Sequence, residues 1–320
     1  MGRKNLTEPT YFILSAVSSL PDLQLPLSWI FLIIYAITVV GNLGMIILTK
    51  LDSHLHTAMY FFIRHLAYMD LGDATTIYPK MLLNFVMGQN TISSHACATQ
   101  MAFFIAFIIS ELFILSAMAY DRYVAICNPL LYSIIMSRAR CHVLVGIPYL
   151  YSSFQAGMIT SKIFVLTFCS SHIRHFYCDN VPVLLMLCSN ARDIKLLIIL
   201  FSAFNLISSL LVVLLSYVLI LLAVCRMKSA EGKRKAFSTC ASHLTVVVVF
   251  YATLLFMYVQ PKSTHSFETD KLTSVFYTLV IPMLNPLIYS FRNKEVKNAF
   301  HRVFRNKFNF FFNVPFRMLV

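Results

Sequence analysis

The feature that most constrains this chain is a series of long segments that contain few or no charged residues. Five segments contain no Lys, Arg, Asp or Glu at all: 23–49, 141–161, 196–225, 236–260 and 272–291. Each has the ~20 residues that a helix needs to cross the hydrocarbon core of a bilayer. Two further apolar segments, 59–86 and 97–120, contain the acids Asp70, Asp73 and Glu111. The pattern predicts an all-α membrane protein, a bundle of seven transmembrane helices.

The composition agrees with a membrane location. Hydrophobic residues make up 58% of the chain and charged residues 12%, with a mean hydropathy of +0.73, whereas soluble domains carry about 25% charged residues. The net charge of +13 would suit a nucleic-acid partner, but the excess Lys and Arg lies on one side of the predicted membrane. We therefore expect no nucleic acid, and we attribute the charge to membrane orientation and to contact with anionic lipid.

The orientation divides the chain into three regions. We expect an extracellular N-terminal tail at 1–24, a seven-helix domain at 25–291, and a cytoplasmic amphipathic helix and tail at 292–320. Basic loops lie inside and an odd number of spans separates the termini, so the only glycosylation sequon, at Asn5, is extracellular. Apolar residues at helical spacing predict the amphipathic helix on the inner membrane surface, with a basic tail without a helix as the alternative; they are Val296, Ala299, Phe300, Val303 and Phe304.

Residues 118–127 read MAYDRYVAIC. Asp121 and Arg122 lie at the end of a long apolar run, where both charges can reach water or a protein partner. This stretch resembles the third-helix signature of olfactory receptors, a branch of the rhodopsin-like G-protein-coupled receptors. LHTAMYFF at 55–62, PKML at 79–82, KAFSTCASHL at 235–244 and PMLNPLIYSFRN at 282–293 resemble motifs of the same family. The chain departs from the family at Ala58, where proline is usual, and at Ala67, where serine is frequent.

The resemblance implies a receptor and not an enzyme. Such a receptor binds a small, mostly apolar volatile odorant and activates a heterotrimeric G protein of the stimulatory olfactory type, which raises cAMP. Its place is the plasma membrane of olfactory cilia. The ligand and the G protein would both stabilise one conformation of the bundle.

Other functions remain as alternatives. The first alternative is a rhodopsin-like receptor for a peptide or an amine. An amine receptor would be expected to carry an acid in the outer half of the third helix, but this helix has no acid on the extracellular side of Glu111. A channel or transporter is the second alternative, although we find no inverted repeat. A membrane enzyme is the third, and the chain contains no HExxH, GxSxG or P-loop motif.

The resemblance also implies an inner switch that opens a cleft for the G protein; its residues are Asp121, Arg122, Tyr217, His243, Asn285, Pro286 and Tyr289. Pro286 removes a backbone hydrogen bond and loosens its helix, which provides a hinge, with a static kink as the alternative. An Asp at a helix centre costs about 2.5–3.5 kcal/mol on insertion scales, so Asp70 and Glu111 must face protein or water. The resemblance implies that these two acids bind sodium, the only cofactor expected. The alternative is a protonated carboxyl group hydrogen-bonded between helices.

Four of the eight cysteines, Cys97, Cys169, Cys178 and Cys188, fall in predicted extracellular segments, where disulfides persist. Four cysteines allow three pairings, and the sequence alone does not choose among them. The resemblance implies Cys97–Cys178 and Cys169–Cys188. The spacing Cys169-x-x-His172-x-x-His175-x-x-Cys178 also matches a zinc site. The oxidising compartment and the disulfide roles argue against zinc, so we expect no metal other than sodium.

Counting along the helices from these motifs predicts a ligand site in the outer half of the bundle. The side chains there are mostly apolar and aromatic, as in most small-molecule pockets; they are Met101, Phe104, Ile105, Ile108, Ile109, Phe201, Asn205, Tyr251, Leu254, Leu255, Tyr258, Val275 and Thr278. Asn205 and Tyr258 are the predicted hydrogen-bonding residues. No fixed charge is present in this set, so we expect a neutral odorant with one oxygen function. The alternative is that these residues only pack the helices together.

Overall fold

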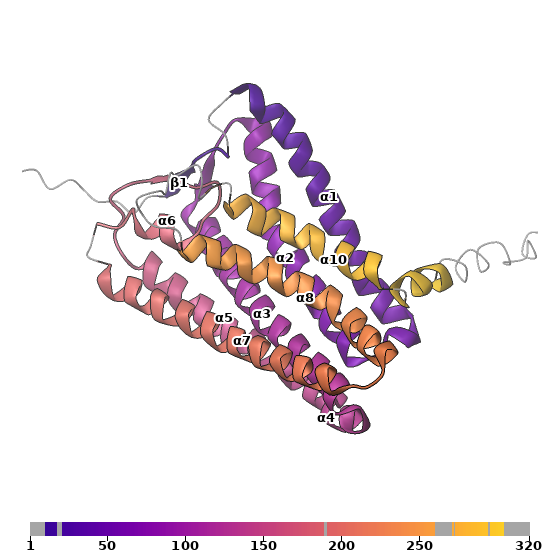
Figure 1. Cartoon of the computed structure of the whole chain (residues 1–320). Helices are drawn as coiled ribbons and strands as arrows, with labels where there is room; N and C mark the ends of the chain where they lie inside the picture. Colours follow the sequence, from indigo (N-terminus) through magenta and orange to yellow (C-terminus); the bar gives the residue numbers. More distant parts are fainter. Residues whose placement is uncertain are drawn as a thin grey trace, which may run out of the picture.

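The computed structural model describes residues 10–17, 21–188, 191–259, 271, 273–293 and 295–303. These residues form a bundle of long helices with a small sheet at one end (Figure 1). Three predictions lie outside the described part of the chain: the glycan at Asn5, the position of Phe304 and the C-terminal tail. The side chain of Tyr258 also lies outside it, although its backbone belongs to a described helix.

Long helices occupy all seven predicted spans. They are α1 (Pro21–Leu51), α2 (Ala58–Met87), α3 (Ser94–Cys127), α5 (Arg138–Phe164), α7 (Arg192–Arg226), α8 (Ala230–Val259) and the helical segment Thr273–Ser290, which contains the π-helical turn η3 (Phe276–Val280) and most of α10 (Ile281–Arg292). At 1.5 Å per residue, a helix of 30 residues is about 45 Å long, which exceeds the ~30 Å hydrocarbon core.

The seven helices differ in how apolar they are. In the described part of the chain, α1, α3, α7 and α8 are each long and apolar enough to cross a membrane, and two bent helical pairs containing α5 and α10 also qualify. Helix α2 is equally long but contains Arg64, Asp70, Asp73 and Lys80. It ends at Gly88, whose φ of 63° is the left-handed conformation that favours glycine after a helix.

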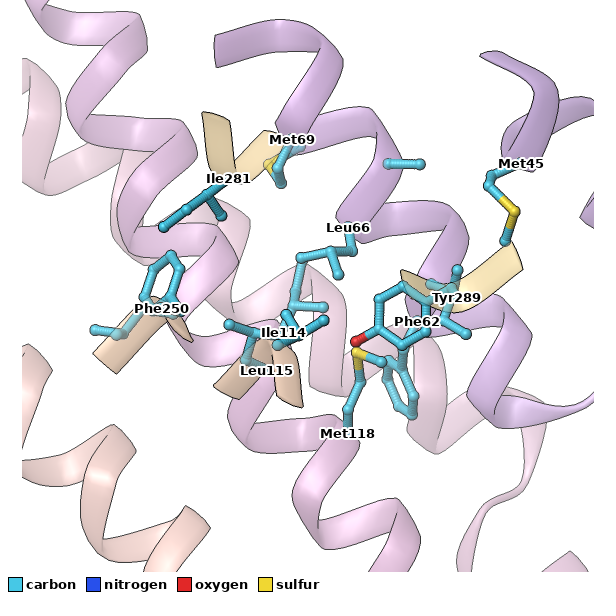
Figure 2. Packing of buried hydrophobic residues seen from close by; sticks show 14 of the residues in the cluster. Met45, Phe62, Leu66, Met69, Ile114, Leu115, Met118, Phe250, Ile281 and Tyr289 are labelled. Carbon is cyan, nitrogen blue, oxygen red and sulfur yellow. The ribbon is translucent and has the colours of Figure 1, made fainter. Parts of the chain in front are cut away.

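Helix α3 lies at the centre of the bundle. Its apolar stretch is 67% buried, against 28% in α1 and in α7, whose remaining apolar side chains form a surface suited to lipid. The core around α3 contains Leu115 and Met118 from α3 itself, Phe62 from α2 and Phe250 from α8 (Figure 2). Tyr289 from α10 lies beside Phe62 and Met118 in this core (Figure 2).

The end of the bundle predicted to be extracellular, called the outer end, contains a three-stranded sheet that was not expected from the sequence. Strand β1 (Tyr11–Leu14) lies between β2 (Thr91–Ser93), to which it is antiparallel, and β3 (His172–Ile173), to which it is parallel. Phe12 and Leu14 are buried on one face of β1, while its other residues are exposed. Region 1–24 is therefore not only a tail: it contains β1 and the start of α1 at Pro21. A four-residue alternation is too short to identify a strand from sequence.

The opposite end, predicted to be cytoplasmic and called the inner end, contains short helical turns between the spans, η1 (Ser53–Leu55), η2 (Pro129–Leu131) and α4 (Tyr132–Ile135). A further helix, Glu295–Val303, is bent by 85° from the seventh span and buries Val296 and Ala299. This is the predicted amphipathic helix. Nε of Arg302 donates to Oδ2 of Asp52 at 2.8 Å, and this bond is the main reason that the pKa of Asp52 falls to about 2.

Candidate functional site

Asn285 joins the two acids of the predicted sodium site. Its Nδ2 donates to both carboxylate oxygens of Asp70, at 2.9 and 3.1 Å, and to Oε1 of Glu111 at 3.4 Å. All three side chains are buried and come from three helices, α2, α3 and α10. Asn42 of α1 is also buried and donates to the carbonyl of Pro282 at 3.0 Å. The structure therefore brings the two predicted acids together around one amide.

A third carboxylate, Asp73, belongs to the same region and was not assigned to the site from sequence. It is 3% exposed, it interacts electrostatically with Glu111 and Asp70, and its Oδ1 has no hydrogen-bond partner among the described residues. The signal was available, because residues three apart lie on one face of a helix. Three buried carboxylates with a single amide donor require protons or a cation to balance their charge.

The oxygen atoms of Asp70 and Glu111 fit a hard cation such as sodium, since hard cations prefer oxygen ligands. Across the described residues, no group of three or more His, Cys, Asp or Glu side chains is arranged to hold a metal ion. A site for a divalent ion held by all three carboxylates is therefore not formed. Asp70 and Glu111, which share Asn285, are the residues that could hold a monovalent cation.

At the inner end of α3, Asp121 and Arg122 form a buried ion pair. The Tyr132 hydroxyl of α4 donates to Oδ1 of Asp121 at 2.7 Å, so the second inner loop also contacts this pair. Sequence reasoning missed Tyr132, because nothing in its local pattern indicates which inner side chain it meets. In this structure Arg122 is held by a carboxylate of its own helix.

A second pair links three helices of the predicted switch. The Tyr217 hydroxyl of α7 and Nδ1 of His243 on α8 are 2.7 Å apart, and Nε2 of His243 lies 3.1 Å from the carbonyl oxygen of Leu115 on α3. Arg122 interacts electrostatically with His243 and with Tyr289. The hydroxyl of Tyr289 has no hydrogen-bond partner in the described part of the chain. Arg122, Tyr217, His243 and Tyr289 therefore lie in one inner region, although the described residues do not join them in a single hydrogen-bond network. Asn285 of the predicted switch bonds to Asp70 instead.

The seventh span is irregular where the sequence predicted a hinge. The π-helical turn at Phe276–Val280 precedes α10, and Pro286 lies inside α10. A Cβ atom on Gly41 would lie 3.0 Å from Cγ of Pro286, so α1 packs closely against the proline. Single π turns inside helices are frequent at functional sites. The span thus combines two features that weaken regular helical hydrogen bonding.

Most positions of the predicted ligand site face the interior. Met101, Phe104, Ile105 and Ile109 of α3 are buried, as are Tyr251 and Leu254 of α8 and Thr278 of the seventh span, while Ile108, Phe201 and Val275 are partly buried. The Tyr177 ring of the outer loop packs on Phe104, with ring centroids 5.0 Å apart. The outer loop therefore covers the outer end of this set.

Two predicted ligand residues are not supported by the structure. Oδ1 of Asn205 accepts from the Tyr151 hydroxyl at 2.8 Å, and its Nδ2 donates to Oε1 of Gln155 at 3.1 Å. Asn205 thus connects α7 to α5 and has its polar atoms already paired. Leu255 is 39% exposed and lies beside the inward face of α8. Counting residues from a motif predicts the helical turn on which a side chain lies, but it does not show which neighbouring helix the side chain contacts.

The outer loop is fixed by the two disulfides that the resemblance implies. Cys97–Cys178 joins α3 to the loop, with Cα atoms 5.5 Å apart, and Cys169–Cys188 closes the loop on itself at 4.9 Å. These bonds use both cysteines of the Cys-His-His-Cys spacing, so no thiolate remains there for zinc. Gln100, which the sequence analysis did not identify, accepts from the Cys178 amide at 2.9 Å and donates to the Thr76 carbonyl at 3.0 Å.

The fold and these motifs define a rhodopsin-like seven-helix membrane protein. The crystal structure of squid rhodopsin has a similar fold, with a TM-score of 0.72 over 90% of this chain and 82% of that chain, at 17% sequence identity. The sequence profile of the olfactory receptor family matches residues 31–307.

Curated relatives are similar over nearly the whole chain. Human olfactory receptor 8K5 is 72% identical over 307 residues, which cover 96% of this chain and 100% of that protein. Human olfactory receptor 8K3 is 64% identical over 312 residues, which cover 97% and 100%. The chain belongs to the olfactory receptor family. It is a multi-pass membrane receptor of the G-protein-coupled class and not an enzyme.

Proposed function

We propose that the receptor binds a small, mostly apolar, neutral odorant between α3, α8 and the seventh span, and that binding activates the stimulatory olfactory G protein and raises cAMP. The observation that carries this proposal is the position of α8. One buried face of this helix contributes Leu254 and Tyr251 to the predicted ligand site and His243 to the inner switch. A ligand that changes the packing of the outer turns of α8 therefore acts on the same helix that contacts Tyr217 through His243.

The mechanism is a shift between conformations. In the structure, His243 ties α8 to α7 and α3, and Arg122 is paired with Asp121. A ligand that binds more tightly to a conformation with these inner contacts broken favours that conformation, and a G protein that binds the same conformation reinforces the effect. We propose that the N-terminus is outside and that the basic inner loops face the G protein and anionic lipid, as the charge distribution supports. The expected location is the ciliary plasma membrane.

We also propose that Asp70 and Glu111 bind one sodium ion in the conformation described here. The ion would offset the charge of two buried carboxylates, and its release would accompany rearrangement of Asn285 and the seventh span. Because Asn285 donates to both acids, movement of α10 changes both ligands at once. Sodium would then oppose activation.

The proposed function is tested by expressing the chain with a cAMP reporter and applying a panel of volatile compounds at matched surface expression. We expect a concentration-dependent cAMP rise for at least one small neutral compound, and none in cells without the chain. A response confined to amines or peptides would show a receptor for another ligand class. A ligand-gated current that does not require a G protein would favour the channel alternative.

A further inference from the structure

His175 is a buried polar residue of the outer loop that the proposed mechanism does not use. It follows β3 and is 4% exposed. Its ring stacks on the Phe176 ring, with centroids 4.7 Å apart, and contacts the Tyr177 ring edge to face, with centroids 4.5 Å apart. Nε2 lies 3.1 Å from the Ser274 hydroxyl at the outer end of the seventh span, whereas Nδ1 has no hydrogen-bond partner among the described residues.

A buried nitrogen without a partner is unusual, because native structures pair nearly all buried polar groups with protein, water or ligand. Burial, together with the nearby charge of Lys271, lowers the pKa of His175 to about 3. The ring is therefore neutral at physiological pH, with one nitrogen donating and the other accepting. Whichever tautomer is present, Nδ1 can form one more hydrogen bond.

The position of His175 places this nitrogen at the outer end of the predicted ligand site. Its neighbour Tyr177 packs on Phe104 of α3. Its partner Ser274 accepts, through the carbonyl oxygen, a hydrogen bond from the Thr278 hydroxyl at 2.7 Å. Phe104 and Thr278 both belong to the predicted ligand site. His175 therefore links the α3 side of that site to its seventh-span side.

We propose that Nδ1 of His175 binds the hydroxyl group of the odorant, which makes alcohols the preferred ligand class. This inference rests on the proposed function. A hydroxyl group donates and accepts, so it pairs with either tautomer of the ring. Asn205, one of the two residues expected to hold the oxygen function, is already paired with α5.

The test compares two substitutions, each of which keeps a polar atom near a different nitrogen of the imidazole ring. In His175→Asn the side-chain amide can place a polar atom near the position of Nδ1, whereas in His175→Gln, one methylene longer, it can place one near Nε2. The probes are medium-length straight-chain primary alcohols and the 1-chloroalkanes of matching length, applied to cells with the cAMP reporter. Surface level is measured with an N-terminal epitope tag, so the two variants control for each other.

We expect the wild type to respond at lower concentrations to an alcohol than to its chloroalkane. His175→Gln should raise the half-maximal concentration of the alcohol about fivefold to tenfold, the effect of one lost hydrogen bond, and should leave the chloroalkane unchanged. His175→Asn should change both little. Should the variants fail to reach the surface, Ser274→Ala serves instead: it keeps the imidazole, removes the group that orients it and should weaken only the alcohol.

The outcomes separate this inference from the function on which it rests. A wild type that responds to volatile compounds but not better to alcohols than to chloroalkanes would overturn the role of His175 and leave the odorant function intact. Equal losses for both probes in His175→Gln and His175→Asn would show that the imidazole only supports the loop. If no volatile compound raises cAMP in the wild type, the proposed function fails, and the inference fails with it.

Discussion

The Tyr217 hydroxyl lies 2.7 Å from Nδ1 of His243, so one hydrogen bond connects the inner halves of α7 and α8. The other ring nitrogen of His243 faces the Leu115 carbonyl of α3 at 3.1 Å. A single imidazole therefore contacts two neighbouring helices at the end where the G protein is expected to bind. Separation of α7 from α8 requires that the bond to Tyr217 break.

Tyr217→Phe removes this bond and keeps the ring. We expect basal cAMP to rise roughly twofold to tenfold, because the loss of one buried hydrogen bond destabilises the conformation described here by about 0.5–1.5 kcal/mol. The measurement is reporter activity without odorant, at matched surface level. Basal activity equal to or below that of the wild type would mean that the bond is kept, or is stronger, in the active conformation.

Arg122→Ala should abolish odorant-stimulated cAMP while surface expression remains measurable. The arginine is buried at the inner end of α3, where its charge is available to a G protein once the pair with Asp121 opens. Arg140→Ala is the matched control, because Arg140 is an exposed arginine at the inner end of α5. Normal signalling by Arg122→Ala at matched surface level would contradict the role assigned to this residue.

Asp70→Asn should remove the effect of sodium on the odorant response. In the wild type, replacing sodium by a large organic cation should lower the odorant concentration needed for half-maximal cAMP, because the proposed ion would stabilise the conformation in which Asp70 and Glu111 share Asn285. Asp193→Asn, at the exposed outer end of α7, should behave like the wild type. A wild-type response independent of sodium would remove the basis for this ion site.

Cys97→Ser and Cys178→Ser should each impair surface delivery, and the double mutant should be little worse than either. Two sulfur atoms that act as one bond give non-additive effects. Surface staining of the three variants against the wild type provides the measurement. Additive losses would show that each cysteine has a separate role in the mature receptor.

Acid should destabilise the folded receptor through His175. Its pKa is about 3 when folded and 6.5 as the reference value, so the unfolded chain binds a proton between these values and the folded chain does not. The contribution of the neutral ring to the free energy of unfolding is complete well above pH 6.5. It declines as the pH falls toward 3, and the loss is about 2 kcal/mol at pH 5. Thermal unfolding of purified receptor at pH 7.5 and pH 5 should show this loss in the wild type and a smaller one in His175→Asn.

The sequence predicted the parts of the fold that depend on composition and spacing. Apolar length identified the spans, and the period of Val296 and Ala299 identified the inner amphipathic helix. Strand β1 was missed because its pairing depends on residues of two distant segments, Ile92 and His172 among them. A short strand carries little local signal when its stability comes from such partners.

The candidate site was predicted less completely, for a related reason. Asp70 and Glu111 were predicted to face protein or water because an acid in an apolar helix must do so, and the family resemblance paired them as a sodium site. The partners of Asn205 were not, because the sequence gives the residues on one face of α7 but not the opposing residues of α5. In the sequence, the spacing around His175 indicates only a possible metal ligand. Its burial and its unpaired nitrogen are properties of the packed outer loop, and no single-sequence pattern reports them.

The sheet at the outer end has a consequence for biosynthesis. Strand β1 leaves the ribosome before any transmembrane helix, yet its residue Ile13 pairs with His172, which is made only after α5. The N-terminal segment can therefore pair with β2 once α1 and α2 have been made, but it cannot complete the sheet until α3 and α5 have followed. Contacts between such distant segments form slowly. The first structured segment to be synthesised is thus among the last to complete its pairing, and capture of that segment by a chaperone or another strand before β3 is made would leave the sheet incomplete.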